Sequence, residues 1–370
     1  EFIKANGEGE RLHKLLERRA SSTDNWLSEW WMEEMFLKPR APLPWRSSPA
    51  LAYPRQTFNT KEDQIRHAAL LVAGALAMKY SIDRQRLKPE VTRAGPLDMS
   101  QYPKLFNTYQ APRRGCDNLE MYSATDEHSW DVVAIHNNQF FTFSGRDARG
   151  TPYDERGVLQ QLQRVVDMSQ EEGAPVGILT TQDRDDWAES YKRFCQSPKN
   201  AACVEAIKKA ALVVCLDRKV NTPEPYEVAC GQQLFTGGSD GENAGNRWCD
   251  KTLQFIVGRE GHTGILFVHS PIDSSLVAAL FDHCYDYAKS RGDFDPSGVV
   301  VNEIPEKLQF ELSQLILQDI DNARHSHARL KHDMDQVIYK FPDYGKDFVK
   351  SRGMSPDSYV QMALQLAYYK

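Results

Sequence analysis

The chain has 370 residues, of which 41% are hydrophobic and 26% are charged, so it is long enough to bury a large core and to form more than one domain. Its net charge of -6 argues against a nucleic-acid-binding protein, whose affinity would come from clustered Lys and Arg. The longest apolar run, 68–78, is far shorter than the roughly 20 residues of a membrane-spanning helix, so none is expected.

Several helical stretches are predicted from the start of the chain onward. After an N-terminal helical segment, 1–20, bulky apolar side chains recur at helical spacing from 24 to 37, which predicts a helix with one face in the core. That face consists of Trp26, Leu27, Trp30, Trp31 and Met35. A proline-rich connector, 38–49, leads to a helix from about 62 to 78, and Thr151 with Pro152 marks the start of a third helix.

Short β-branched runs predict the strands, and they lie between helical stretches, at 132–135, 176–179, 212–216 and 253–257. The last of these runs is followed by a polar, glycine-bearing turn and the apolar run 264–268, so the two together predict a hairpin. Helices interleaved with strands indicate an α/β protein with a mixed sheet covered by helices. Beyond 311 the chain is predicted to be helical again, over 312–332 and 355–369.

The cysteines and histidines indicate a reduced protein without a metal centre. Seven cysteines are scattered and include no C-x-x-C pair, which favours an intracellular protein without disulfides. His325, His327 and His332 cluster in sequence, but helical spacing cannot bring the three rings to one ion. The N-terminal stretch has no apolar signal core or targeting pattern, so we expect a soluble protein of the mitochondrial matrix, peroxisome or cytoplasm.

A histidine directly after an apolar strand is the candidate for chemistry. His269 follows the run 264–268, and Asp273 stands four residues on. This placement exposes an imidazole at a sheet end, and a side chain whose ordinary pKa is about 6.5 suits general-base work near neutrality. The alternative is a hydrogen-bonded structural histidine, because H-x-x-x-D by itself is a weak pattern. The glycine-rich run 237–241 fits no phosphate-binding pattern and is interpreted as a turn.

The surroundings of His269 resemble the choline/carnitine O-acyltransferase family. The similarity covers Gly245-Asn-Arg-Trp-Cys-Asp-Lys-Thr-Leu-Gln-Phe-Ile-Val257, the following strand, His269 and Asp273. Similar segments stand in the family's order along almost the whole chain: Asn25-Trp-Leu-Ser-Glu-Trp-Trp31, Ser47-Ser-Pro49, Gly177-Ile-Leu-Thr180 with Arg184, and Tyr344-Gly-Lys346 through Ser355-Pro-Asp357 to Tyr369.

The resemblance implies a fold of two halves, each like chloramphenicol acetyltransferase, with a tunnel between them in which coenzyme A and the alcohol meet at His269. It implies a catalytic α/β domain over 21–311 and the start of a second, incomplete half over 312–370. It also implies a monomer that transfers a short acyl group reversibly between coenzyme A and the hydroxyl of carnitine, without an acyl-enzyme. Coenzyme A is then a substrate, and no permanently bound cofactor is expected.

Four further residues take roles from the resemblance. Lys346 and Lys350 match the family's pair that binds the 3′-phosphate of coenzyme A, and their spacing of four suits one helix face. Asp357 matches an adenine-side contact and also suits a helix start, where the dipole favours an acidic residue. Asp273 matches the family's acidic position, where it orients the imidazole or its loop, or simply caps the loop.

The sequence departs from the family at two positions. Val268 stands where Glu is common before the histidine, and Gln110 stands where Arg is common. The family's Thr-Tyr-Glu-Ser segment, its Ser-Thr-Ser motif and its carboxylate-binding Arg would lie beyond Lys370, and a chain without them is expected to be inactive. Three alternatives therefore stay open: a choline O-acetyltransferase, an acyl-releasing domain of a multidomain synthase, and a non-catalytic relative that binds coenzyme A.

Overall fold

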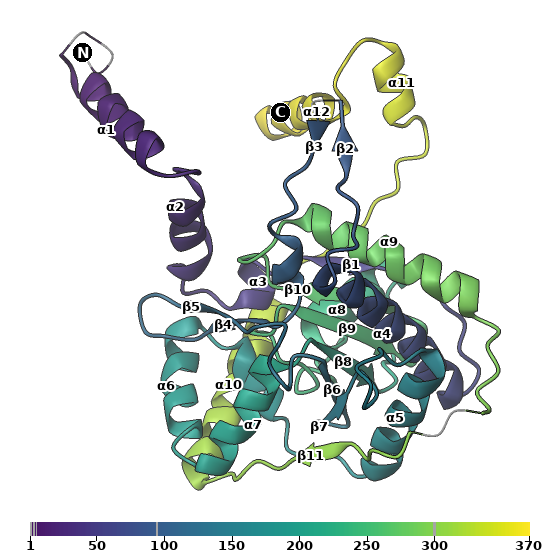
Figure 1. The fold of residues 1–370 in the computed structure, drawn as a ribbon. Helices are drawn as coiled ribbons and strands as arrows, with labels where there is room; N and C mark the ends of the chain where they lie inside the picture. The colour runs from purple at the N-terminus through teal and green to yellow at the C-terminus, as the bar shows by residue number, and fades with distance from the viewer. Residues whose placement is uncertain (1, 3, 5, 94, 299–300) are drawn as a thin grey trace. The chain divides into compact units, whose positions relative to one another are not determined.

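The computed structural model describes residues 2, 4, 6–93, 95–298 and 301–370 (Figure 1). Its contacts divide the chain into two compact units, 1–334 and 335–370. The helical elements of the first unit are α1 (Glu8–Ser22), α2 (Ser28–Met32), the π-helix η1 (Glu33–Leu37), α3 (Leu43–Arg46), α4 (Lys61–Asp83), η2 (Tyr102–Leu105), α5 (Glu155–Met168), η3 (Val176–Thr181), α6 (Arg184–Phe194), α7 (Pro198–Lys209), α8 (Tyr226–Thr236), α9 (Ser274–Arg291) and α10 (Gln314–His332).

A mixed sheet of seven strands forms the centre of the first unit, in the order β1-β10-β9-β8-β6-β7-β11. Strands β6, β8 and β9 run parallel to one another, and the other neighbours pair antiparallel. The strand bounds are β1 (Ala50–Ala52), β6 (Asp131–His136), β7 (Gln139–Ser144), β8 (Leu212–Asp217), β9 (Leu253–Gly258), β10 (Thr263–Phe267) and β11 (Glu306–Leu308). Two small ribbons pair β2 (Val91–Thr92) with β3 (Gly95–Pro96) and β4 (Thr108–Ala111) with β5 (Asn118–Met121).

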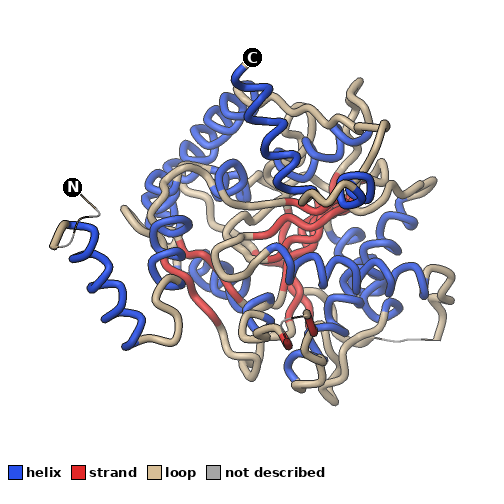
Figure 2. Tube along the Cα trace, turned by 90° about the horizontal axis from the view of Figure 1, so that it is seen from above, coloured by secondary structure: helices blue, strands red, loops and turns tan. Residues whose placement is uncertain are grey.

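Helices cover both faces of the sheet, which explains why the central strands β8 and β9 are buried at every position (Figures 1 and 2). Successive side chains of a strand point to opposite faces, so β8 sends Leu212, Val214 and Leu216 into one core cluster. Helices α4, α5 and α9 complete that cluster. The alternate residues Val213 and Cys215 enter the second cluster, against side chains of α6, α7, α8 and α10. The predicted mixed sheet covered by helices is confirmed.

The longest helix, α4, shows how local signals and burial act together. Thr60 accepts from the backbone of Asp63, and the Asp63 carboxylate accepts from the backbone N–H of Thr60, which closes a capping box. The following 23 residues pack against the sheet and two helices, so apolar side chains occur all around the helix rather than in one stripe. The helix was expected to end near 78, and it continues to Asp83.

Two sequence predictions in the first unit are wrong. The run 176–179 forms the buried 3₁₀ helix η3 rather than a strand. Its Gly177 packs against backbone, since a Cβ there would lie 2.0 Å from Arg247 O. The apolar face predicted to be core between 24 and 37 is instead 38–51% exposed, because α2 and η1 are short and lie at the rim of a pocket, where Leu27 and Trp31 line the opening.

The second unit, 335–370, contains α11 (Lys346–Ser351) and α12 (Pro356–Tyr369). Ser355 caps α12 by accepting from Ser358 N, and Pro356 occupies the first helical position. The predicted helix 355–369 is confirmed. The predicted domain boundary near 311 stays a prediction.

Candidate active site

His269 lies just beyond the end of β10, on the short loop that leads into α9. The loop is anchored to the segment before β1, because His269 N donates to Ser47 O, and it is closed by a turn in which Ile272 N donates to His269 O, each at 3.3 Å. One face of the imidazole stacks on Phe36 of η1, with ring centroids 5.2 Å apart and planes 13° from parallel. The Nε2 atom lies 3.3 Å from Ser274 Oγ at the start of α9. These contacts fix the ring at the sheet edge.

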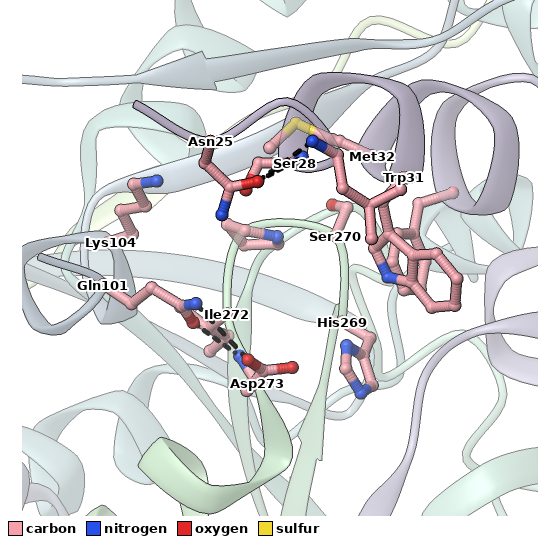
Figure 3. A pocket seen from close by; sticks show the side chains of 13 residues that line it. Asn25, Ser28, Trp31, Met32, Gln101, Lys104, His269, Ser270, Ile272 and Asp273 are labelled. Carbon is pink, nitrogen blue, oxygen red and sulfur yellow. Dashed lines mark hydrogen bonds between the residues drawn. The ribbon is translucent and has the colours of Figure 1, made fainter. Parts of the chain in front are cut away.

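The imidazole opens onto a pocket of about 390 Å³ (Figure 3). Its apolar wall comes from Leu27, Trp31, Met32 and Phe36. The polar lining comes from Asn25, Ser28, Gln101, Lys104, Ser270 and Asp273. A histidine beside a concave, half-apolar cavity is the arrangement expected of a general base that must meet a small organic substrate.

One oxygen of the Asp273 carboxylate is hydrogen-bonded to Gln101 (Figure 3). Gln101 Nε2 donates to Asp273 Oδ2 at 3.3 Å, and Asp273 N donates to Gln101 Oε1 at 3.0 Å. Asp273 also occupies the N-cap position directly before α9, although its side chain makes no capping hydrogen bond there. The pair therefore joins the loop after His269 to the segment before η2, and Asp273 contributes to the position of the loop.

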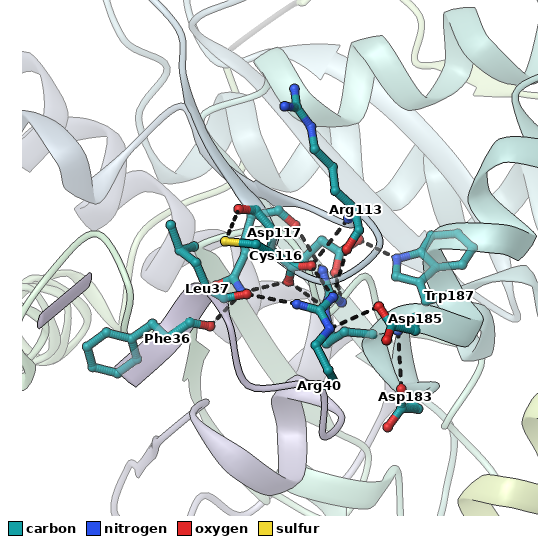
Figure 4. A network of polar contacts seen from close by, with 12 residues as sticks. Phe36, Leu37, Arg40, Arg113, Cys116, Asp117, Asp183, Asp185 and Trp187 are labelled. Carbon is teal, nitrogen blue, oxygen red and sulfur yellow. Dashed lines mark hydrogen bonds and ion pairs between the residues drawn. The ribbon is translucent and has the colours of Figure 1, made fainter. Parts of the chain in front are cut away.

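A buried polar network holds the segment that carries Phe36 (Figure 4). Gln110 Nε2 donates to Phe36 O at 3.2 Å and to Asp117 Oδ2 at 2.8 Å. The carbonyl of Leu37 accepts from Asp117 N at 2.9 Å and from Arg40 Nη1 at 2.8 Å. Asp117 thus orders two successive carbonyls, one directly and one through Gln110, and fixes the ring that stacks on His269. Gln110, which stands where Arg is common in the family, therefore makes buried structural contacts.

Arg184 is the cation that joins the two buried carboxylates of this network. Its fully buried guanidinium lies 2.6 Å from Asp117 Oδ2 and 2.6 Å from Asp250 Oδ1. Asp250 also accepts from Tyr109 Oη at 2.9 Å and from Trp187 Nε1 at 2.6 Å. Burial opposes the charge of Arg184, but the two carboxylates outweigh it and raise the pKa of the guanidinium, so Arg184 remains protonated.

The second unit carries the other predicted site residues. Lys346 and Lys350 lie on α11, four residues apart, which confirms the predicted helical spacing. Asp357 is in the first turn of α12, where its charge complements the helix dipole.

Sequence reasoning singled out His269 as a candidate but missed the residues that contact it. Ser274 directly follows Asp273 at the start of a helix, and this position was the one sequence signal that could have indicated its contact with His269. Phe36 and Gln101 are 233 and 168 residues away from His269 in sequence, and no local pattern connects them to it.

Within the described residues, no three His, Cys, Asp or Glu side chains come together in a way that would hold a metal ion. No helix in the described part of the chain combines the length and the apolar character needed to cross a bilayer.

Comparison with known proteins identifies the class of protein to which this fold and site belong. The profile of the choline/carnitine O-acyltransferase family matches residues 1–370, so the chain belongs to that family. The carnitine O-acetyltransferases of Columba livia and Homo sapiens are each 36% identical over 373 residues, and the choline O-acetyltransferase of Gallus gallus is 33% identical over 381. All of this chain is covered in each comparison, and it spans 59% of the length of each relative. The family predicted from the motifs is confirmed.

Proposed function

We propose that this chain is the His269-bearing part of an acyl-CoA-dependent O-acyltransferase that moves a short acyl group between coenzyme A and carnitine. The observation that carries the proposal is the imidazole of His269, stacked on Phe36 and open to the pocket. The slightly higher identity to carnitine O-acetyltransferases, 36% against 33%, favours carnitine. Choline is the second candidate substrate, because choline O-acetyltransferases match the same full length of the chain.

In the proposed reaction, His269 acts as general base toward the alcohol hydroxyl. The imidazole accepts the hydroxyl proton while the alcohol oxygen attacks the thioester carbonyl carbon. A tetrahedral oxyanion forms, the carbon–sulfur bond breaks, and the leaving sulfur takes the proton back from the imidazolium. The reverse reaction deprotonates the thiol instead. The acyl group passes directly between the two substrates, so no acyl-enzyme forms.

The remaining roles are parts of the same proposal. Asp273, through its hydrogen bonds with Gln101, holds the loop of His269 so that the imidazole faces the pocket. Lys346 and Lys350 bind the 3′-phosphate of coenzyme A, and Asp357 contacts its adenine side. The first half folds like chloramphenicol acetyltransferase, and 312–370 begin a second half of the same kind. The mixed sheet with helices on both faces supports this architecture.

An assay of thiol release tests the activity. We expect the full-length protein to release free coenzyme A from acetyl-CoA when carnitine is added, as followed with a thiol reagent. Choline in place of carnitine provides the comparison, and a higher kcat/KM for choline would reassign the substrate. Release that is equally slow with either alcohol and without one would contradict the transferase proposal and favour a non-catalytic relative.

A lysine double variant tests the coenzyme A assignment. Changing Lys346 and Lys350 to Ala should weaken the binding of coenzyme A much more than that of dephospho-coenzyme A, because two cations facing one phosphate are lost. Calorimetric titration of both ligands measures the difference. Lys192→Ala with Lys289→Ala, which removes the same charge from two exposed positions of the first unit, serves as the control. A parallel loss for both ligands would contradict the phosphate contact.

A further inference from the structure

A second pocket lies at the sheet edge opposite His269. The parallel strands β6, β8 and β9 end in register, since His136 pairs with Leu216 and Asp217 pairs with Gly258. His269 belongs to the other edge, because β10 runs antiparallel and its last residue, Phe267, pairs with Leu253 at the start of β9. The carboxyl ends of parallel strands are the edge at which open α/β sheets hold their ligands.

This strand-end pocket encloses about 300 Å³ and is lined by residues that directly follow the three strands. Its cationic side chains are Lys61 from the first turn of α4, Arg218 and Lys219 after β8, and Arg259 after β9. Ile65, Val166 and Leu216 supply apolar lining. Four cations from three separate segments thus converge on one small cavity with an apolar wall.

Three of the four cations form no ion pair within 4.0 Å among the described residues. Arg218 pairs with Glu172 at 2.7 Å, whereas Lys61, Lys219 and Arg259 have no carboxylate within 4.0 Å among the described residues. Asp217 also lines the pocket, but both of its oxygens are bound by Arg247, at 2.6 and 2.7 Å. Two further acids lie near enough to act on these cations: Glu260 on Lys219 and Arg259, and Asp63 on Arg259. Glu260 accepts from Val220 N at 3.2 Å, and Asp63 accepts from the backbone N–H groups that precede α4. Three cations therefore remain available to a ligand.

His136 reports the positive potential inside the pocket. Its Nδ1 atom lies 2.7 Å from Ser169 Oγ. Burial and the neighbouring cations Lys61 and Arg218 lower the pKa of the imidazole to about 4, although Asp217 acts in the opposite direction. The ring is therefore neutral at pH 7. It lies beside cations whose positive electrostatic potential a bound anion would offset.

We infer that the strand-end pocket binds a small soluble phosphate ester or diphosphate, separate from the acyl-transfer site. Lys61, Lys219 and Arg259 match the charge and the several acceptor oxygens of such a group, and the guanidinium fork of Arg259 favours phosphate. The apolar wall of Ile65, Val166 and Leu216 takes the compact organic part of the ligand. The assignment rests on the sheet edge, the cavity and its cations, and it is independent of the proposed reaction of His269.

Inorganic pyrophosphate is the probe for the first experiment. At constant ionic strength, it should bind the full-length protein in calorimetric titration and raise the melting temperature, whereas acetate should do neither. The double variant Lys219→Gln with Arg259→Gln should weaken pyrophosphate at least about tenfold, because two charge-assisted contacts are lost. The control Arg114→Gln with Lys192→Gln removes the same charge from exposed positions of the first unit and should change the affinity less than about twofold.

The proposed coenzyme A lysines require their own control. In Lys346→Gln with Lys350→Gln, the binding that depends on Lys219 and Arg259 should persist. Binding that is lost in this variant and retained in the strand-end variant would overturn the inference, as would no measurable binding of pyrophosphate to the unmodified protein. Vesicles of phosphatidylcholine with phosphatidic acid form a separate arm, and vesicle binding that requires Lys219 and Arg259 would overturn the assignment to a soluble ligand.

A measurement on the unmodified protein covers the case in which the variant does not fold. In spectra of histidine-labelled protein, the ring signal of His136, assigned with His136→Gln, should shift during a pyrophosphate titration with the affinity found by calorimetry. His262, which is held by Gln233 at 2.9 Å outside the pocket, should not shift. A titration that moves neither ring, or moves both equally, would overturn the inference.

Discussion

Replacing His269 by Ala should lower the rate of acyl transfer by at least about a hundredfold in the full-length protein, because the alcohol loses its general base. The loss should appear in kcat for both directions of the reaction, since the same imidazole serves the hydroxyl and the thiol. Thiol release from acetyl-CoA measures the forward rate, and acetyl-CoA formation from the acylated alcohol measures the reverse rate.

The matched control is His325→Ala, which removes an exposed imidazole from α10. It should leave both rates unchanged. The affinity of His269→Ala for coenzyme A and its melting temperature should stay close to those of the unmodified protein, which separates lost chemistry from lost folding. Full activity in His269→Ala would contradict the mechanism, even if the family assignment stands.

Replacing Arg184 by Met should lower the free energy of unfolding by about 3–5 kcal/mol, because two carboxylates are left buried without their cation. Asp117 and Asp250 both lie 2.6 Å from the guanidinium, and all three side chains are fully buried. Burial raises the pKa of the Asp250 carboxyl, which favours its neutral form as the pH falls, so the difference between the variant and the unmodified protein should shrink at lower pH. Chemical denaturation at two pH values measures both effects.

Arg114→Met is the control for this experiment, because Arg114 is 82% exposed and lies 3.9 Å from Glu189. Its effect should stay within about 0.5 kcal/mol. A loss of less than about 1 kcal/mol in Arg184→Met would mean that the network relaxes or admits water. The role assigned to it in holding Phe36 would then be contradicted as well.

The parts of the fold that follow local rules were predictable from the sequence. The hairpin of β9 and β10, the strand β8 and helix α10 stand close to their predicted places, because each has a continuous apolar run or a helical repeat between clear turns. The run 176–179 has the same composition as a buried strand, and periodicity cannot separate a strand from a short buried helix. Its helical state is decided by the backbone of 245–247, which Gly177 allows to approach closely.

For the candidate site, the sequence allows a prediction of the central histidine but not of the residues around it. A histidine after an apolar strand predicts a base, and the family resemblance strengthens that prediction. The stacking partner Phe36 and the amide of Gln101 reach His269 and Asp273 only through tertiary contacts. The exposed face of α2 shows the same limit, since helical spacing indicates which side chains share a face and leaves open what covers them.

The π-helical turn η1 makes the number of residues before Phe36 as important for the site near His269 as the identity of those residues. A π turn contains one more residue than the α turn it replaces, and each helical residue turns the side chain by about 100°. Removing a single residue between 33 and 35 would therefore rotate the ring of Phe36 away from the imidazole, or break the hydrogen bonds that the carbonyl of Leu37 accepts. Evolution along this segment should accept exchanges of side chains far more readily than gaps or insertions.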